Sequence, residues 1–236
     1  MTGPPLPPRA ALLLDLDGTL IDIAPTPDAV VVPPALPPAL RRLRARLDDA
    51  LAVVSGRPIG QIDALLGDAP YAVAGEHGAA VRHAPCATVE RAALPDLPAG
   101  WVESAEQAAA ERPGALVERK THGLVIHYRR APAEGPALER IIQRMLDGHR
   151  DRFELLAGSL TWEIRPLGVT KEVAVNALMA RPPFAGRVPV YIGDDVTDED
   201  GIRAARAMGG EGWRVVEMFN NASGVRAWLH EQAFVA

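Results

Sequence analysis

Short continuous apolar runs recur in the first and last thirds of the chain, and each is followed by polar residues or glycine. Unbroken runs of four to six apolar residues are typical of parallel strands that are buried on both faces. The stretches between them have the three-to-four-residue spacing of amphipathic helices. We expect strands at 10–14, 51–54, 71–74, 188–192 and 213–217, and helices at 37–47, 59–66, 173–179 and 222–229.

Strands that alternate with helices predict an α/β fold with a Rossmann-like, doubly wound parallel sheet. The middle of the chain has a different pattern, in which helices alternate with pairs of shorter strands. That pattern predicts a small antiparallel sheet with helices on one face, inserted into the first fold. The inserted elements are expected as helices at 101–112 and 136–146 and as strand pairs at 115–120 with 124–129 and 153–156 with 160–165. We therefore predict a core made of residues 1–93 and 169–236, and an α/β cap domain at 94–168.

Composition narrows the class of protein. Hydrophobic residues make up 48% of the 236 residues, which is enough for a substantial core. A net charge of −5 gives no general attraction to nucleic acid or to an anionic membrane. No apolar run approaches transmembrane length, residues 1–10 lack the apolar stretch of a signal peptide, and a single cysteine excludes an internal disulfide. We expect a soluble cytoplasmic protein that binds neither nucleic acid nor membranes.

The first expected strand ends in the hexapeptide Asp15-Leu-Asp17-Gly-Thr-Leu20. Side chains two apart on an extended segment share a face, so both carboxylates can approach one substrate atom. One carboxylate can attack an electrophile while the other transfers the proton of the leaving group. Ligands of such sheets bind at the carboxyl ends of the strands, where this motif lies. An isolated pair of acids would equally suit a solvated turn, but the whole hexapeptide after five apolar residues favours a catalytic site.

Two further segments carry groups that suit a phosphate. Ser55-Gly56-Arg57 follows the second strand, where a hydroxyl and backbone N–H groups can bind an anion. Lys171 precedes an apolar helix and can neutralise a phosphoryl group. Only Lys120 and Lys171 are lysines among 25 basic residues, which indicates that these two positions need a compact charge rather than the planar fork of arginine.

The strand at 188–192 is followed by Gly193-Asp194-Asp195-Val-Thr-Asp198. Carboxylates that share a site with Asp15 repel one another unless a cation lies between them. A hard cation with oxygen ligands and retained waters, such as Mg²⁺, fits this set. Some of the acids that follow serve only to begin a helix, which its dipole favours.

Together, these four segments resemble the haloacid-dehalogenase-like phosphatase superfamily in their order along the chain. The resemblance implies that Asp15 is the nucleophile and Asp17 the general acid and base, and that Ser55, Gly56 and Lys171 bind the phosphoryl group. It implies that Mg²⁺ binds Asp15, the main-chain carbonyl of Asp17, and Asp194, with Asp198 supporting the metal shell or Lys171. It also places the larger α/β cap of that superfamily where the insert lies.

The insert contributes carboxylates and a lysine at its expected strands, namely Glu118 and Lys120 on one face and Glu163 on another strand. Such groups suit a ligand with many hydroxyls, because each hydroxyl donates and accepts. With Gly75-Glu-His-Gly78, the insert resembles the trehalose-6-phosphate phosphatase family. That resemblance implies that the substrate is bound by a set of five side chains: Arg57, His77, Glu118, Lys120 and Glu163. The cap would close over the sugar and expel water.

Two alternatives remain open on the residues alone. One is the same chemistry on another sugar phosphate, such as sucrose 6-phosphate or a mannosyl phosphate. The other is a non-catalytic regulatory module that retains the fold, although such a module has no need of both a nucleophile and an acid. The expected partner is a small sugar phosphate, and a trehalose-phosphate synthase of the same pathway is a second expected partner.

Overall fold

The computed structural model describes residues 3–234, and the chain divides into two compact units. The larger unit contains the residues up to Ala92 together with those from Thr170 onward, and the smaller unit runs from Ala93 to Val169. Each unit encloses its own cluster of buried hydrophobic side chains. The smaller unit is therefore an insert with an independent core, and the two units are described separately.

The larger unit is built on one seven-stranded sheet, in the order β11-β10-β1-β2-β3-β4-β5. The five strands from β11 to β3 run parallel, and β4 and β5 extend the edge in antiparallel fashion. All five residues of β1 are buried, as an unbroken apolar run in the middle of a sheet requires. The strands are β1 (Ala10–Leu14), β2 (Leu51–Val54), β3 (Ala72–Gly75), β4 (Ala80–Arg82), β5 (Glu90–Arg91), β10 (Val188–Gly193) and β11 (Glu211–Arg214).

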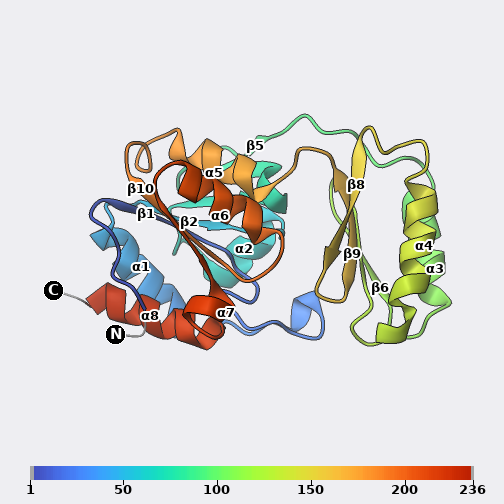
Figure 1. The fold of residues 1–236 in the computed structure, drawn as a ribbon, viewed down its shortest axis with the longest axis horizontal. Helices are drawn as coiled ribbons and strands as arrows, with labels where there is room; N and C mark the ends of the chain where they lie inside the picture. The colour runs from blue at the N-terminus through green and yellow to red at the C-terminus, as the bar shows by residue number, and fades with distance from the viewer. Residues whose placement is uncertain (1–2, 235–236) are drawn as a thin grey trace. The chain divides into compact units, whose positions relative to one another are not determined.

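Helices cover both faces of this sheet, with α5 and α6 on one side and α1 and α8 on the other (Figure 1). The helices of the larger unit are α1 (Leu36–Arg46), α2 (Ile59–Leu66), α5 (Lys171–Met179), α6 (Asp198–Ala207), α7 (Val215–Met218) and α8 (Ala222–Phe234), with 3₁₀ turns η1 (Pro27–Ala29) and η2 (Glu76–Gly78). Across the described part of the chain, no helix combines the length and the apolar character needed to cross a membrane.

The smaller unit is an antiparallel sheet in the order β6-β7-β9-β8, with two helices along one face (Figure 1). Its elements are α3 (Trp101–Ala110), β6 (Leu116–Arg119), β7 (Leu124–His127), η3 (Pro132–Glu134), α4 (Gly135–Met145), β8 (Phe153–Gly158) and β9 (Thr161–Pro166). Leu124, Ile126 and Ile164 of the sheet share a buried cluster with Leu138 and Ile142 of α4. The alternate residues of the same strands lie on the opposite face, which carries charged side chains.

The predicted α/β class with a doubly wound parallel sheet is confirmed. One predicted element is wrong in part, because the strand expected at 213–217 ends at Arg214 and the apolar residues after it form the short helix α7. Short apolar runs fit a strand or a helix equally well, so periodicity could not separate them. Strands β4 and β5 were not predicted, and α5 begins at Lys171, two residues before the expected start.

Candidate active site

Two acidic motifs meet at one edge of the larger sheet, because β1 and β10 are parallel neighbours that end together. Leu14 pairs with Ile192, and the N–H of Asp15 donates to the carbonyl of Ile192 at 2.9 Å. Asp15, directly after β1, therefore lies beside Gly193, the last residue of β10, and Asp194 follows that glycine. The register of two buried strands thus brings together residues that are far apart in the sequence.

Lys171, the first residue of α5, lies between two buried carboxylates. Its ammonium nitrogen lies 2.7 Å from Oδ1 of Asp15 and 2.5 Å from Oδ1 of Asp198. The three residues are between 0% and 4% exposed, so their charges interact with little screening by water. Thr170 begins the helix by accepting a hydrogen bond from the N–H of Val173, which fixes where the lysine leaves the backbone.

Both carboxylate oxygens of Asp198 already accept hydrogen bonds from the protein. The hydroxyl of Tyr191 donates to Oδ1 at 2.6 Å, beside Lys171, and the N–H of Asp195 donates to Oδ2 at 3.0 Å. A Cβ at Gly193 would overlap the carboxylate of Asp198. Strand β10 must therefore end in glycine for Asp198, the first residue of α6, to pack against it. Asp198 is therefore a fixed anion that orients Lys171.

The cluster holds three carboxyl groups and one lysine, and this excess of acids shifts the pKa values of its members. Burial, followed by repulsion from Asp198, raises the pKa of the Asp15 carboxyl well above its ordinary value. The same two causes raise the pKa of Asp194 to about 7. Burial alone would lower the pKa of Lys171, but attraction to Asp15 and Asp198 outweighs burial and raises it. The lysine thus stays charged, while the carboxylates gain from any additional cation.

The donor atoms of the cluster fit a hard divalent cation. One carboxylate oxygen from each of Asp15, Asp194 and Asp198 lies within 4.8 Å of the others. Such oxygens are the ligands that Mg²⁺ and Ca²⁺ take in proteins. Since Oδ1 of Asp198 already accepts two hydrogen bonds and the residue is fully buried, Asp15 and Asp194 are the side chains best placed to bind the ion directly.

The segment after Asp15 turns sharply beneath this cluster. Gly18 has a φ of 81°, and a Cβ there would overlap the carboxylate of Asp194. The carbonyl of Leu16 accepts the N–H groups of Leu20 and Ile21 at 2.8 and 3.0 Å, which closes the turn. Glycine is thus required at position 18, both by its backbone conformation and by the close approach of Asp194.

Asp17 is held by an arginine from the second motif. The guanidinium of Arg57 donates to both carboxylate oxygens of Asp17, at 2.6 and 2.7 Å. The N–H of Arg57 donates to the hydroxyl of Ser55 at 3.1 Å, which shapes the loop after β2. The structure thus joins the first two motifs through a bidentate ion pair, a geometry that lysine could not provide.

A strained turn supports the loop of Ser55, Gly56 and Arg57. Glu76 and His77 have φ values of 52° and 56°, a left-handed conformation that is costly for residues with side chains. Their N–H groups donate to the carbonyls of Arg57 and Ser55, each at 3.0 Å. A Cβ at Gly56 would approach the ring of His77 to 2.7 Å, so glycine is needed there for the ring to pack. Non-glycine residues in such conformations cluster at functional sites.

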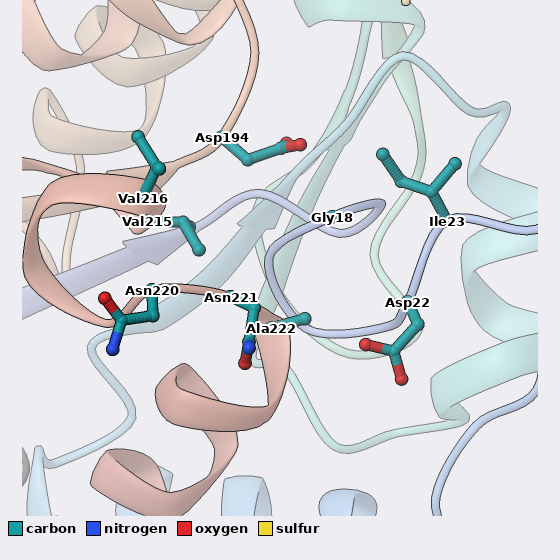
Figure 2. Close-up of a pocket in the computed structure, with 9 residues that line it drawn as sticks. All are labelled: Gly18, Asp22, Ile23, Asp194, Val215, Val216, Asn220, Asn221 and Ala222. Carbon is teal, nitrogen blue, oxygen red and sulfur yellow. The ribbon is translucent and has the colours of Figure 1, made fainter.

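An open cavity of about 310 Å³ lies beside the acidic cluster (Figure 2). In Figure 2, the carboxylate of Asp194 extends toward the turn that carries Gly18. The lining residues are Gly18, Asp22, Ile23, Asp194, Val215, Val216, Asn220, Asn221 and Ala222. Asp194 is therefore accessible on this side, whereas Asp198 is enclosed.

In the smaller unit, Glu118 and Glu163 both pair in register with Val125 of the strand between them. They therefore share the sheet face that the helices leave uncovered. Glu163 accepts a hydrogen bond from Lys120 at 2.7 Å, and a ring nitrogen of His127 lies 2.8 Å from Glu118. Burial alone would raise the pKa of Glu118, but the hydrogen bond to His127 and the charge of Lys120 lower it.

Two residues of these networks carried no expected role. Tyr191 stands in an otherwise aliphatic strand, and a buried tyrosine needs a partner for its hydroxyl, which could have marked it. The pairing of His127 with Glu118 depends on the hairpin register and left no local signal. The predicted site residues fall into three groups. One is the cluster of Asp15, Asp194, Asp198 and Lys171. The second is Asp17 with Arg57, beside Ser55, Gly56 and His77, and the third, in the smaller unit, is Glu118, Lys120 and Glu163.

The family model and the similar sequences agree on one family. The family model of trehalose-phosphatase matches residues 13–226. A probable trehalose-phosphate phosphatase of Sinorhizobium fredii is 41% identical over 209 residues, covering 87% of this chain and 77% of the relative. The trehalose-6-phosphate phosphatase of Escherichia coli is 38% identical over 208 residues, covering 88% and 77%.

Solved structures show the same fold. The C-terminal domain of trehalose-6-phosphate phosphatase from C. albicans superimposes with a TM-score of 0.80 over 98% of each chain, at 21% sequence identity. At that identity the likeness concerns the fold alone. The family match spans β1 to α8 and so includes every motif of the acidic cluster. This chain belongs to the trehalose-phosphatase family, and its fold is like that of a haloacid-dehalogenase-like hydrolase from Bacteroides thetaiotaomicron.

Proposed function

We propose that the chain hydrolyses trehalose 6-phosphate to trehalose and phosphate through a phosphoryl group carried on Asp15, with Mg²⁺ as cofactor. The observation that carries the proposal is the buried cluster of Asp15, Lys171 and Asp198 in a member of the trehalose-phosphatase family. Relatives that are 38% and 41% identical to this chain over 208 and 209 aligned residues are named as a trehalose-6-phosphate phosphatase and a probable trehalose-phosphate phosphatase.

The proposed reaction has two displacements at phosphorus. A carboxylate oxygen of Asp15 attacks the phosphorus, the bond from phosphorus to the sugar oxygen breaks, and Asp17 gives that oxygen its proton. Asp17 then takes a proton from water, whose oxygen attacks the phosphorus and releases phosphate from Asp15. Lys171 and the loop of Ser55 and Gly56 bind the phosphoryl oxygens and stabilise their charge in both transition states.

Asp15, Asp194 and the main-chain carbonyl of Asp17 would hold the metal ion. Bound Mg²⁺ supplies positive charge against the phosphoryl oxygens and against the excess of carboxylates. The two hydrogen bonds that Oδ1 of Asp198 accepts, together with the complete burial of the residue, support its role as an anchor for Lys171 rather than as a ligand. The open cavity beside Asp194 leaves room for the waters that Mg²⁺ usually keeps.

The smaller unit is proposed to recognise the sugar. Glu118, Lys120 and Glu163 share one polar sheet face, and they offer acceptors and a donor for hydroxyl groups. Arg57 and His77, in the larger unit, complete the proposed substrate-binding set. The hydrogen bonds of Glu118 to His127 and of Glu163 to Lys120 keep these side chains in place before a ligand binds, which reduces the entropy lost on binding.

Two alternatives make different predictions. A phosphatase of sucrose 6-phosphate or of a mannosyl phosphate would use the same cluster with another sugar. A non-catalytic regulatory module would need no paired nucleophile and acid, so the intact Asp15 and Asp17 argue against it. With trehalose 6-phosphate as the substrate, we propose that a trehalose-phosphate synthase of the same pathway supplies it and that both act in the cytoplasm.

Phosphate release from a panel of substrates tests the proposal. The purified protein with Mg²⁺ is assayed on trehalose 6-phosphate, sucrose 6-phosphate and glucose 6-phosphate. We expect kcat/KM for trehalose 6-phosphate to exceed the other two by about 10²-fold, because a site built to bind a whole disaccharide loses that energy with the wrong sugar. Equal rates on all three would reject the sugar assignment, and no release from any would reject the phosphatase.

A further inference from the structure

Tyr191 is a fully buried polar residue that the proposed reaction does not use. It lies in β10, between Val190 and Ile192, and none of its surface is exposed. Its hydroxyl donates a 2.6 Å hydrogen bond to Oδ1 of Asp198. A buried hydroxyl at this distance from a carboxylate forms a strong, charge-assisted hydrogen bond.

That hydrogen bond is the last link of a chain that reaches the proposed nucleophile. Tyr191 donates to Asp198, Asp198 accepts from Lys171, and Lys171 donates to Asp15, at 2.6, 2.5 and 2.7 Å. Tyr191 and Lys171 bind the same oxygen of Asp198. The strength with which that oxygen holds the lysine therefore depends on whether the phenol shares it.

The ring of Tyr191 packs against Gly201, which has no side chain to obstruct it. A Cβ at Gly201 of α6 would lie 2.6 Å from two carbon atoms of the tyrosine ring. Helix α6 thus contacts Tyr191 at two places. Its first residue, Asp198, accepts the hydrogen bond from the hydroxyl, and Gly201 leaves room for the ring. The position of the hydroxyl is set by this packing rather than by a flexible loop.

We propose that Tyr191 is a positioning residue for phosphoryl transfer, whose hydroxyl shares the charge of Asp198 so that Lys171 reaches Asp15 and the phosphoryl group. This inference rests on the proposed roles of Asp15 and Lys171. Without the phenol, the carboxylate of Asp198 accepts one hydrogen bond fewer. It then attracts the ammonium group of Lys171 more strongly. Lys171 then moves away from the phosphoryl oxygens, and the transition state loses part of its stabilisation.

The kinetic test is Tyr191→Phe, which removes the hydroxyl and keeps the ring. At a temperature well below the melting temperature, we expect kcat to fall by about 10- to 100-fold while KM stays within about threefold. Trehalose 6-phosphate and p-nitrophenyl phosphate should lose kcat by the same factor, because the cluster serves both. The matched control is Tyr71→Phe, at a tyrosine that packs on Phe184, and its kcat should not change. A kcat for Tyr191→Phe within twofold of the wild type would overturn the inference.

A second variant moves the ring instead of deleting the hydroxyl. Gly201→Ala places a methyl group against the ring of Tyr191 and should displace the hydroxyl from Asp198. If both variants act through that one hydrogen bond, the double variant Tyr191→Phe/Gly201→Ala should lose no more activity than the worse single variant. Multiplied losses in the double variant would contradict a shared route through the hydroxyl.

The chain offers a readout that does not depend on turnover, because it contains two lysines. With ¹⁵N-labelled lysine, the Nζ resonance of Lys171 should shift in Tyr191→Phe, whereas that of Lys120, paired with Glu163, should stay in place. Unchanged resonances for both lysines would overturn the inference. If the wild type fails to hydrolyse trehalose 6-phosphate but the Lys171 resonance shifts, the proposed substrate is wrong and the role of Tyr191 in placing the lysine stands.

Discussion

The two lysines of this chain lie one in each unit, in surroundings that differ in charge balance. In the larger unit, Lys171 faces the carboxylates of Asp15 and Asp198, and its side chain is 3% exposed. In the smaller unit, Lys120 pairs with Glu163, and its side chain is 10% exposed. Both lysine side chains are at most 10% exposed and hydrogen-bonded, so low exposure alone does not distinguish a site for chemistry from a site for recognition.

The difference lies in the number of acids around each lysine. Asp194 adds a third carboxylate to the larger unit's cluster, and its pKa is raised to about 7. In the smaller unit, Glu118 has His127 as a further partner, and its pKa is lowered. Uncompensated negative charge favours the binding of a cation, whereas a balanced network favours neutral, hydroxyl-rich ligands. The following changes test that contrast, from the largest expected effect to the smallest.

Asp15→Asn should remove activity from the larger unit's cluster altogether. The amide keeps the shape of the carboxylate but cannot attack phosphorus, so kcat should fall by about 10³-fold or more on every substrate. The melting temperature should not fall, since burial and repulsion from Asp198 disfavour the ionised carboxylate that is removed and outweigh its attraction to Lys171. Phosphate release and thermal unfolding measure the two effects. Turnover within tenfold of the wild type would exclude Asp15 as the nucleophile.

The same substitution in both units separates their roles. Lys171→Arg should lower kcat by about 10²-fold or more on trehalose 6-phosphate and on p-nitrophenyl phosphate, because the broad guanidinium does not fit between two buried carboxylates. Lys120→Arg should lower activity on trehalose 6-phosphate alone. Parallel kcat and KM measurements on both substrates compare the variants. A loss for Lys120→Arg on p-nitrophenyl phosphate would show that the smaller unit's lysine does more than bind the sugar.

Glu118→Ala should weaken sugar recognition and spare the chemistry. We expect kcat/KM for trehalose 6-phosphate to fall by about 10²-fold, while p-nitrophenyl phosphate hydrolysis changes less than twofold. Arg119→Ala is the matched control, since Arg119 follows on the same strand and pairs with Glu106 of α3. Equal losses on both substrates would mean that Glu118 stabilises the fold, which would contradict its proposed role in binding the sugar.

Magnesium should stabilise the protein more at high pH than at low pH. The folded protein keeps a proton on Asp194 up to about pH 7, which the unfolded chain loses near pH 4, so the metal-free protein loses stability as the pH rises between those values. A cation removes the repulsion once the carboxylates are ionised. The rise in melting temperature on adding Mg²⁺ should therefore be about 3 °C or more larger at pH 8 than at pH 5.5.

Differential scanning fluorimetry with and without Mg²⁺ at the two pH values makes this comparison. Asp194→Asn is the control, because it removes a proposed ligand and the titrating group together. Its Mg²⁺-dependent rise should be small at both pH values. A rise in the wild type that is the same at pH 5.5 and pH 8 would contradict the charge imbalance.

Glu172→Gln should have the smallest effect. Glu172 follows Lys171 on α5 and pairs with Arg203 of α6 at 3.1 Å, but the two side chains are 43% and 63% exposed. Exposed ion pairs contribute about 0–1 kcal/mol, so kcat should stay within twofold and the melting temperature within about 3 °C. Kinetics and thermal unfolding of the variant test this. A tenfold loss of kcat would mean that this surface pair helps to place Lys171.

The sequence was most informative where one local feature sufficed. Unbroken apolar runs predicted β1, β2 and β10, and the hexapeptide after β1 marked Asp15 and Asp17 as candidates. It was least informative where a segment was short or lay at an edge. The apolar residues Val215 and Val216 suited the end of a strand, and the two-residue strand β5 has no recognisable pattern.

By itself, therefore, the sequence determined the α/β class, and it marked an insert and the residue types proposed for the site, because periodicity and motifs are local properties. Only the tertiary structure decided which groups share a hydrogen bond: Arg57 with Asp17, Tyr191 with Asp198, and His127 with Glu118. Those pairings depend on strand register and on helices packed against strands. They join side chains of different segments, 40, 7 and 9 residues apart in that order, and the low dielectric of the interior then fixes which charges must be paired.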